Sequence, residues 1–238
     1  MVASVEQVNV GQDIMDVYTS VPDGKGPFPA IVVIMNAFGV AEFTKTMCDR
    51  FAKEGYLAVA PDLFHTISDE MSEASGKSKR ELLDDTQIIS DVESTIGFLN
   101  NNPLVESGKM GITGFCCGGR IAWMMAAVSD SFSATIPYYG GNLFAVWGDN
   151  DVTPFDMANN INCPILFHFG ENDDNPSQQD MLTLDKELTS LGKDYRFYTY
   201  PEAGHAFMDF SDKVRHNQRA SAMSWPRTLD FLEKHVKN

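Results

Sequence analysis

Short apolar segments alternate with longer segments of helical periodicity along most of this chain. The clearest apolar run, 29–35, is continuously hydrophobic, as a parallel strand buried on both faces should be. Further strands are expected at 56–60, 110–115, 133–136, 164–168 and 195–200. Helical patterns separate them at 43–54, 82–99, 120–128, 178–191 and 224–236. This order predicts an α/β fold, with a mostly parallel twisted sheet and helices on both faces.

The remaining segments complete the expected architecture. Residues 5–21 are typical of one or two antiparallel edge strands, and Pro226 is expected in the first turn of the last helix. Two segments, 64–81 and 141–163, have no clear periodicity, and such excursions tend to lie at an active-site rim. No linker or internal repeat divides the chain, so residues 1–238 are expected to form a single domain.

The chain is strongly acidic, with 33 Asp and Glu against 18 Lys and Arg and a formal net charge of −15. Nucleic acids and anionic membranes need a basic face, so neither is an expected partner. The acidic N-terminus does not resemble a signal peptide, and the four cysteines lack the spacing of a disulfide framework. We expect a reduced, cytoplasmic protein that acts on a small molecule as a monomer or weak homodimer.

Two of the cysteines are adjacent, at Cys116 and Cys117, between Gly114 and Gly118. Adjacent cysteines form a strained ring and are not the two-residue-spaced pair of a dithiol redox site. No Cys-x-x-Cys or His-x-x-x-His pattern supports a zinc site, so no metal is expected. A pair of small buried hydrophobes is an alternative. The Gly-x-Cys-x-Gly spacing between a strand and a helix favours a nucleophile elbow instead, with Cys116 as the nucleophile.

An elbow of this kind needs an acid and then a histidine, each in a loop after a later strand. His205 follows the strand 195–200, where the base should be. Asp173 follows the strand 164–168 and is the preferred acid, with Asp174 and Glu171 as weaker candidates. The following helix points its N-terminus at Cys116, which favours the thiolate, and the backbone N–H of Cys117 is placed to bind an oxyanion.

Of the other histidines, His168 falls inside a strand and is expected to face the core. His65 belongs to the irregular segment 64–81 and is a candidate rim residue. His216 and His235 are typical of surface positions.

These residues resemble the dienelactone hydrolase family of the α/β-hydrolase superfamily. The similar motifs are the elbow 114–119, the acid loop 168–173, the base loop 202–207, and shorter matches at 38–40, 60–63, 138–140 and 227–231. The resemblance implies a hydrolase without cofactor, in which Cys116 attacks an ester or lactone carbonyl. His205, oriented by Asp173, moves the proton, and the N–H groups of Ala37 and Cys117 hold the oxyanion.

Two positions depart from the family pattern. Asn36 occupies the position at which family members that open dienelactone have a glutamate, which is thought to help activate the thiol. An amide cannot accept a proton, so that mode of activation is not expected here. Asp209 stands where an arginine binds the substrate carboxylate, so a neutral ester or lactone is expected, with an organophosphate triester as a side substrate. Lys79 or Arg80 could supply the missing cation. The candidate pocket residues are Asn36, Phe38, Tyr138, Phe207 and Asp209.

The alternative interpretation is a non-hydrolytic member of the family that binds a ligand or senses thiol oxidation. The adjacent thiol of Cys117 and the replacement at Asn36 favour it.

Overall fold

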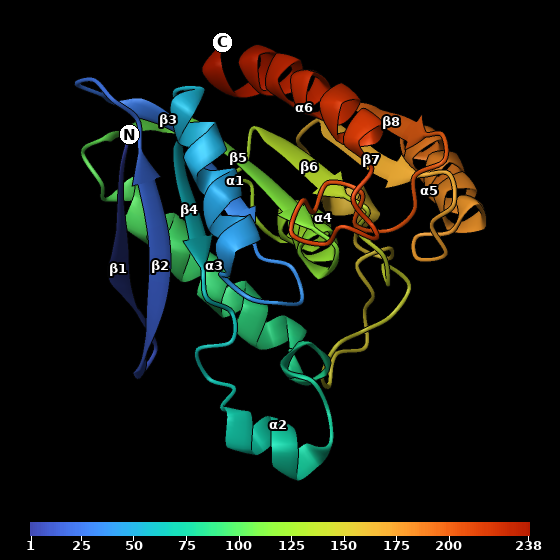
Figure 1. Ribbon diagram of the computed structural model, residues 1–238, viewed down its shortest axis with the longest axis horizontal. Helices are drawn as coiled ribbons and strands as arrows, with labels where there is room; N and C mark the ends of the chain where they lie inside the picture. The colour runs from blue at the N-terminus through green and yellow to red at the C-terminus, as the bar shows by residue number, and fades with distance from the viewer.

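The structure, a computed structural model describing residues 1–238, contains one eight-stranded sheet between layers of helices (Figure 1). The sheet order is β1-β2-β4-β3-β5-β6-β7-β8. The first two strands pair antiparallel, β2 joins β4 antiparallel, and the other strands are parallel. The strands are β1 (Val2–Val10), β2 (Asp13–Val21), β3 (Phe28–Ile34), β4 (Leu57–Pro61), β5 (Val105–Phe115), β6 (Ala134–Tyr138), β7 (Ile165–Gly170) and β8 (Tyr195–Tyr200).

Helices cover both faces of the sheet: α3, α4 and α5 pack on one face and α1 and α6 on the other. The helices are α1 (Glu42–Lys53), α2 (Asp69–Ser75), α3 (Asp85–Asn100), α4 (Cys117–Val128), α5 (Gln178–Ser190) and α6 (Gln218–Leu232). Short 3₁₀ helices lie at η1 (Lys79–Leu82) and η2 (Ala158–Asn160), and a π-helical turn, η3 (Glu233–Lys237), ends the chain. No helix is both long and apolar enough to cross a lipid bilayer.

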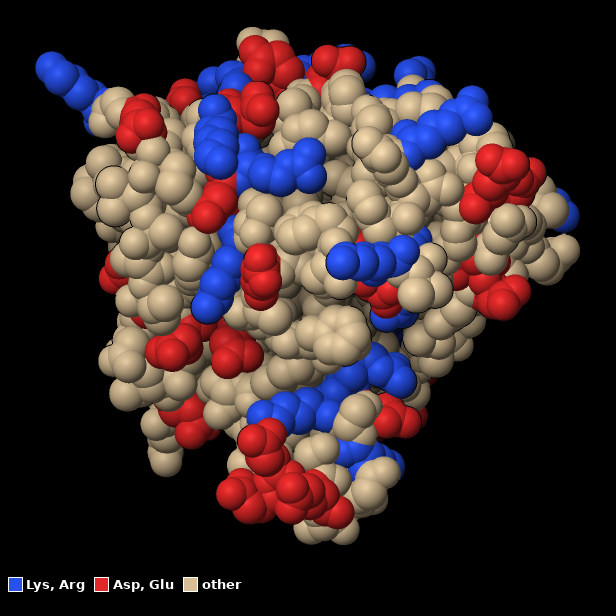
Figure 2. All heavy atoms as spheres, viewed as in Figure 1, with Lys and Arg blue, Asp and Glu red and all other residues tan.

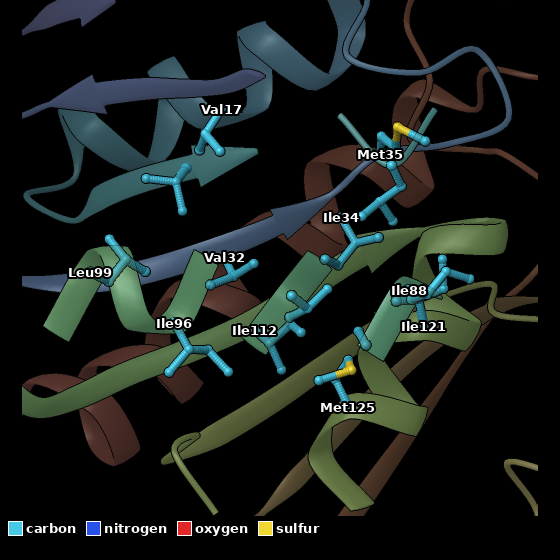
Figure 3. Packing of buried hydrophobic residues seen from close by; sticks show 14 of the residues in the cluster. Val17, Val32, Ile34, Met35, Ile88, Ile96, Leu99, Ile112, Ile121 and Met125 are labelled. Carbon is cyan, nitrogen blue, oxygen red and sulfur yellow. The ribbon is translucent and has the colours of Figure 1, made fainter. Parts of the chain in front are cut away.

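The central strand β3 explains why its sequence is continuously apolar. Val32 and Ile34 point to the layer of α3 and α4, while Ile31 and Val33 point to α1 and α6. All four side chains are fully buried. Figure 3 shows the first of these layers, in which β3 and β5 pack against Ile88, Ile96, Leu99, Ile121 and Met125. A parallel strand buried on both faces needs apolar residues at every position.

The α/β-hydrolase architecture and the antiparallel edge strands are as the sequence predicts, but two local expectations are wrong. The segment 64–81 is not wholly irregular, because Ser68 caps α2 by accepting the N–H of Met71 and η1 follows. Helix α6 begins at Gln218 because the side chain of Asn217 caps the N–H of Ala220, so Pro226 lies inside the helix. The cap sets where this helix begins, and the proline does not.

Candidate active site

The predicted nucleophile lies on a sharp turn between β5 and α4. Cys116 has φ 60° and ψ −120°, a positive-φ backbone conformation that residues other than glycine rarely adopt. The turn is possible because its neighbours are glycines. A Cβ on Gly114 would overlap the carbonyl of Gly118, and a Cβ on Gly118 would lie 2.5 Å from the carbonyl oxygens of Ile34 and Met35. The glycine spacing read from the sequence is therefore a packing requirement of the elbow.

The acid and base loops meet at the carboxyl ends of β7 and β8. Nδ1 of His205 lies 2.9 Å and 3.2 Å from the two carboxylate oxygens of Asp173. Asp173 is buried and also accepts the N–H of Asn175 at 2.9 Å. The loops pack closely, since a Cβ on Gly170 would overlap the carbonyl of Ala203. The carboxylate is fixed by these contacts and can hold the imidazole in one orientation.

The weaker acid candidates lie outside this contact. The carboxylate of Glu171 accepts the N–H of Glu202 at 3.0 Å, and Asp174 is exposed. Asp173 alone among the three carboxylates hydrogen-bonds to His205.

Cys116 and His205 carry opposite charges across the neutral pH range. Hydrogen bonding from the Cys117 thiol, together with the hydrogen bond and charge of His205, outweighs burial and lowers the pKa of Cys116 to about 4. Burial disfavours the charged imidazole, but hydrogen bonds with Asp173 and Cys116 outweigh it and raise the pKa of His205 to about 10. The two groups therefore form a thiolate–imidazolium pair, which is the reactive form of a cysteine nucleophile.

The two predicted oxyanion donors come from the elbow and from the loop after β3. Cys117 is the first residue of α4, where helix N–H groups have no partner within the helix. Ala37 follows β3, is half-buried, and its N–H donates to no acceptor in the protein. The side chain of Cys117 is buried, and its sulfur lies 3.8 Å from the carbonyl oxygen of Met35, the residue after β3. Its thiol thus packs α4 against the end of β3 as well as lowering the pKa of Cys116.

Comparison with known proteins places this site in a family. The model of the dienelactone hydrolase family matches residues 15–236, nearly the whole chain. The chain belongs to that family.

Relatives and solved structures agree with this dienelactone hydrolase assignment. A "Putative carboxymethylenebutenolidase" of Methylorubrum extorquens is 30% identical and covers 99% of this chain and 82% of its own. The structure of a "Putative Dienelactone Hydrolase" from Klebsiella pneumoniae has a TM-score of 0.89 at 28% identity, over 97% of this chain and 98% of that one. A dienelactone hydrolase-like promiscuous phosphotriesterase from metagenomic libraries shares the fold, with a TM-score of 0.81 at 21% identity over 98% of both chains. The family identifies this protein as a hydrolase.

The two residues at which the sequence departs from the expected family pattern, Asn36 and Asp209, contact each other. Asn36 Nδ2 donates to a carboxylate oxygen of Asp209 at 3.2 Å, and Asn36 Oδ1 accepts the N–H of Phe38 at 3.0 Å. The other oxygen of Asp209 accepts the N–H and the hydroxyl of Ser211. Asp209 is 2% exposed and has no cationic partner. Its negative charge is buried and held close to the loop that carries Ala37.

A groove of about 540 Å³ lies between the loop after β3 and the segment after His205. Its lining residues are Asn36, Phe38, Ala41, Glu42, Phe43, Ser211, Asp212 and Lys213. Phe38 is 66% exposed, so its ring is available to a bound molecule. Of the five predicted pocket residues, Asn36 and Phe38 line this groove.

The other predicted pocket residues lie in the interior. Tyr138 is fully buried and its hydroxyl lies 2.6 Å from that of Thr228. Phe207 is also fully buried and packs against Tyr139 and Tyr200. Tyr139 is not among the residues predicted from the sequence, yet its ring contacts His205. The only signal for it was its place beside Tyr138 after a strand that ends near the elbow.

Two histidines outside the site form buried contacts. His168 lies in the core as expected, between the hydroxyls of Tyr200 and Thr228. His65 does not line a rim: its Nε2 lies 3.0 Å from the buried carboxylate of Asp91. The structure also contains no cluster of three or more His, Cys, Asp or Glu side chains that could hold a metal ion.

The segment 64–81 brings a cation near the elbow. The guanidinium of Arg80 lies 6.0 Å from the ring centroid of Trp147. The hydrogen bond with Cys116 and burial raise the pKa of Cys117, and the positive charge of Arg80 opposes this rise only weakly. Lys79 instead pairs with Asp69 at 2.8 Å. Figure 2 shows basic side chains gathered just above the acidic tip of the molecule formed by α2. Arg80 is therefore the better candidate for a cation that contacts substrate.

The charge pair predicts how Cys116 reacts with pH. The lowered pKa of Cys116 means that its thiol re-forms only below about pH 4, and the raised pKa of His205 means that the imidazolium persists to about pH 10. Alkylation of Cys116 by iodoacetamide, followed by peptide mass spectrometry, should therefore be nearly constant from about pH 5 to about pH 9. Cys163 is an internal control, because burial raises its pKa to about 12 and its alkylation should increase with pH. A tenfold rise per pH unit at Cys116 near neutrality would contradict the charge pair.

Proposed function

We propose that this protein is a cysteine-dependent hydrolase of carboxylic esters or lactones, with Cys116 as nucleophile, His205 as acid and base, and Asp173 as the group that orients His205. The observation that carries the proposal is the contact of Asp173 with Nδ1 of His205 at 2.9 Å beside the elbow. The lowered pKa of Cys116 and the raised pKa of His205 support a thiolate–imidazolium pair there. Such a pair is what nucleophilic catalysis at a carbonyl carbon requires.

Acylation follows from this geometry. The thiolate of Cys116 attacks the carbonyl carbon, forming a C–S bond while the carbonyl π electrons move to oxygen. The N–H groups of Cys117 and Ala37 stabilise that oxyanion. When the intermediate collapses, the C–O bond to the alcohol breaks and His205 donates its proton to the departing oxygen.

In deacylation, water hydrolyses the thioester on Cys116. Water attacks the thioester carbon and gives a proton to the now neutral His205. The second intermediate then collapses, the C–S bond breaks, and the thiolate–imidazolium pair is restored. Asp173 stabilises the imidazolium in both half-reactions.

Activation of the thiol does not need a carboxylate at position 36. The amide of Asn36 is bonded to Asp209 and to the N–H of Phe38, so it acts as a structural hydrogen-bonding group. Cys116 is already a thiolate through Cys117, His205 and the start of α4. We infer that the Cys116 nucleophile is already a thiolate before substrate binds.

A neutral substrate fits the charges beside the groove. Asp209 is a buried carboxylate without a cation partner, and Glu42, Asp212 and Lys213 line the groove. Arg215 pairs with Asp212 at 2.6 Å, so Asp209 and Glu42 supply the unpaired negative charge there. An anionic group placed there would be repelled. The thiolate and the two N–H donors could also meet an activated phosphorus centre, and the phosphotriesterase that shares this fold supports an organophosphate triester as a side substrate.

Arg80 supports a second candidate, an anionic lactone. The relative from Methylorubrum extorquens is named a "Putative carboxymethylenebutenolidase", and Arg80 makes no salt bridge within the protein.

Matched substrates separate the two candidates. We expect kcat/KM for a neutral p-nitrophenyl ester to exceed that for its carboxylate-bearing isostere by about tenfold, since one charge contact near a protein surface is worth on the order of 1–2 kcal/mol. Arg80→Gln should leave the neutral ester within about twofold. A preference for the anionic substrate that Arg80→Gln removes would replace the neutral assignment, and Lys79→Gln is the matched control for charge alone.

A panel of p-nitrophenyl esters, lactones and triesters tests the reaction class itself. Hydrolysis of none of them by the wild-type protein would overturn the proposal. Selective peroxide oxidation of Cys116 in that protein would then support the thiol-sensing alternative.

A further inference from the structure

Tyr139, directly after β6, has three unusual features at one residue. Its φ is 39°, in the left-handed region that favours glycine. Its side chain is 1% exposed, yet its hydroxyl has no hydrogen-bond partner. Its ring contacts the predicted catalytic base, His205. Strained backbone and unsatisfied buried groups both cost stability, and they concentrate where function requires a fixed placement.

The backbone on both sides of Tyr139 is tied to the elbow and the neighbouring strand. The carbonyl of Tyr138 accepts the N–H of Cys116 at 3.1 Å, and the N–H of Tyr139 donates to the carbonyl of His168 at 2.7 Å. Gly140 packs directly on Gly119 of α4, where a Cβ on either residue would overlap the other's backbone. Tyr139 is therefore held at a set position relative to Cys116.

The ring of Tyr139 forms one wall of the pocket that holds the imidazole. Its centroid lies 5.3 Å from that of His205, at an interplanar angle of 65°. Phe207 lies behind it at 5.1 Å and 72°, and Phe115 at 6.3 Å. These contacts leave the ring no other position, because it is surrounded by buried aromatic side chains.

The hydroxyl does not explain why this residue is present. The backbone N–H of Met208 faces it without a hydrogen bond of normal geometry, and burial together with the charges of Cys116 and Asp209 outweighs this contact and raises the pKa of Tyr139, so the phenol stays neutral. A group that neither bonds nor ionises contributes through its ring. The strained backbone of Tyr139 therefore fixes the position of its aromatic ring against His205.

We propose that Tyr139 is a positioning residue for His205: its ring holds the imidazole at the angle at which Nδ1 meets Asp173 and the opposite nitrogen faces Cys116. The effect on turnover rests on the proposed hydrolase function, whereas the effect on the thiolate of Cys116 does not. Small displacements of a catalytic group cost large factors in rate, so a loose imidazole should be visible in both.

The test compares Tyr139→Met, which keeps the volume and removes the aromatic edge, with Tyr139→Phe, which keeps the ring. For Tyr139→Met we expect the pH midpoint of Cys116 alkylation to rise by about one unit and kcat/KM to fall about 10- to 100-fold. Tyr139→Phe should keep the wild-type alkylation midpoint and a kcat/KM within about twofold of wild type. It should also unfold at a higher temperature than wild type, because an unsatisfied buried hydroxyl is gone.

The matched control is Tyr200→Met. Tyr200 is also 1% exposed and also packs on Phe207, but its hydroxyl lies 2.8 Å from Nδ1 of His168 and it makes no aromatic contact with His205. This variant should lose stability and keep the alkylation midpoint. Tyr139→Leu gives a second test of the missing edge if Tyr139→Met does not fold.

Two results would overturn the inference. One is a folded Tyr139→Met or Tyr139→Leu protein whose alkylation midpoint and kcat/KM match wild type. The other is an equal midpoint shift in Tyr200→Met, which would reduce Tyr139 to a core residue. If wild type alkylates at Cys116 across neutral pH but hydrolyses no ester, the proposed function fails and the alkylation midpoints still decide the role of Tyr139.

Discussion

Cys116→Ala should lower kcat/KM for a p-nitrophenyl ester by at least about 10⁴-fold, since removing the nucleophile of a triad leaves only binding and oxyanion stabilisation. The physical reason is the lost thiolate. His205 remains beside Asp173, but no atom can form the covalent bond to the carbonyl carbon. Stability should change little, because a partly buried sulfur is replaced by a slightly smaller side chain. The measurements are steady-state hydrolysis and thermal unfolding on the same preparation.

Cys163→Ala is the control for this variant. Cys163 is also half-buried and free, but burial raises its pKa to about 12 and it lies at the opposite end of β7 from Asp173. Its activity should match wild type. Cys116→Ser tests whether the loss comes from the missing nucleophilic atom or from the missing thiolate. A serine keeps a nucleophilic atom but is not a stable anion at neutral pH, so activity should stay far below wild type. Equal activity of the wild-type and Cys116→Ala proteins would contradict the assignment of Cys116.

The elbow and its partners were readable from the sequence because each depends on short-range features. Gly114 is required by overlap with Gly118 within one turn, Gly118 by overlap with the end of the adjacent strand β3, and Asp173 and His205 each follow a recognisable strand. A parallel sheet brings the carboxyl ends of its strands to one edge, so chain order was enough to predict that the two side chains meet.

The contacts that surround these residues could not be read in this way. Asn36 and Asp209 are 173 residues apart, and no local pattern indicates that they share a hydrogen bond. The positive φ of Tyr139 goes with backbone hydrogen bonds from Cys116 to Tyr138 and from Tyr139 to His168, which no local pattern indicates. Likewise, His65 was placed at a rim because its partner, Asp91, lies on a helix that the sequence alone does not position.

Helix α2 was a different kind of miss, because its signals are present in the sequence. Ser68 caps its start and Gly76, at φ 65°, ends it. The helix has no buried residue, so it lacks the apolar periodicity on which the sequence interpretation depended. Surface helices of this kind are found by their caps rather than by their hydrophobic faces.

Arg120→Met should lower the free energy of unfolding by about 3–5 kcal/mol, because breaking a buried ion pair leaves an uncompensated charge. Arg120 is fully buried in the first turns of α4, and its guanidinium donates to both carboxylate oxygens of Asp85 at 2.6 Å and 2.9 Å. It also donates to the carbonyl oxygens of Asn142 and Ala145 and stacks on Trp147 at 3.9 Å. One side chain thus joins the elbow helix, the start of α3 and the segment after β6.

The expected fall in melting temperature is roughly 10 °C for a chain of this size. Arg50→Met is the matched control: Arg50 also stacks on a tryptophan, Trp225, at 3.9 Å, but it makes no salt bridge, so its loss should be about 1 kcal/mol. Adding Asp85→Leu to Arg120→Met should recover part of the loss, because the orphaned carboxylate is removed. A loss for Arg120→Met no larger than that for Arg50→Met would show that this network does not hold the segment after β6 to the elbow.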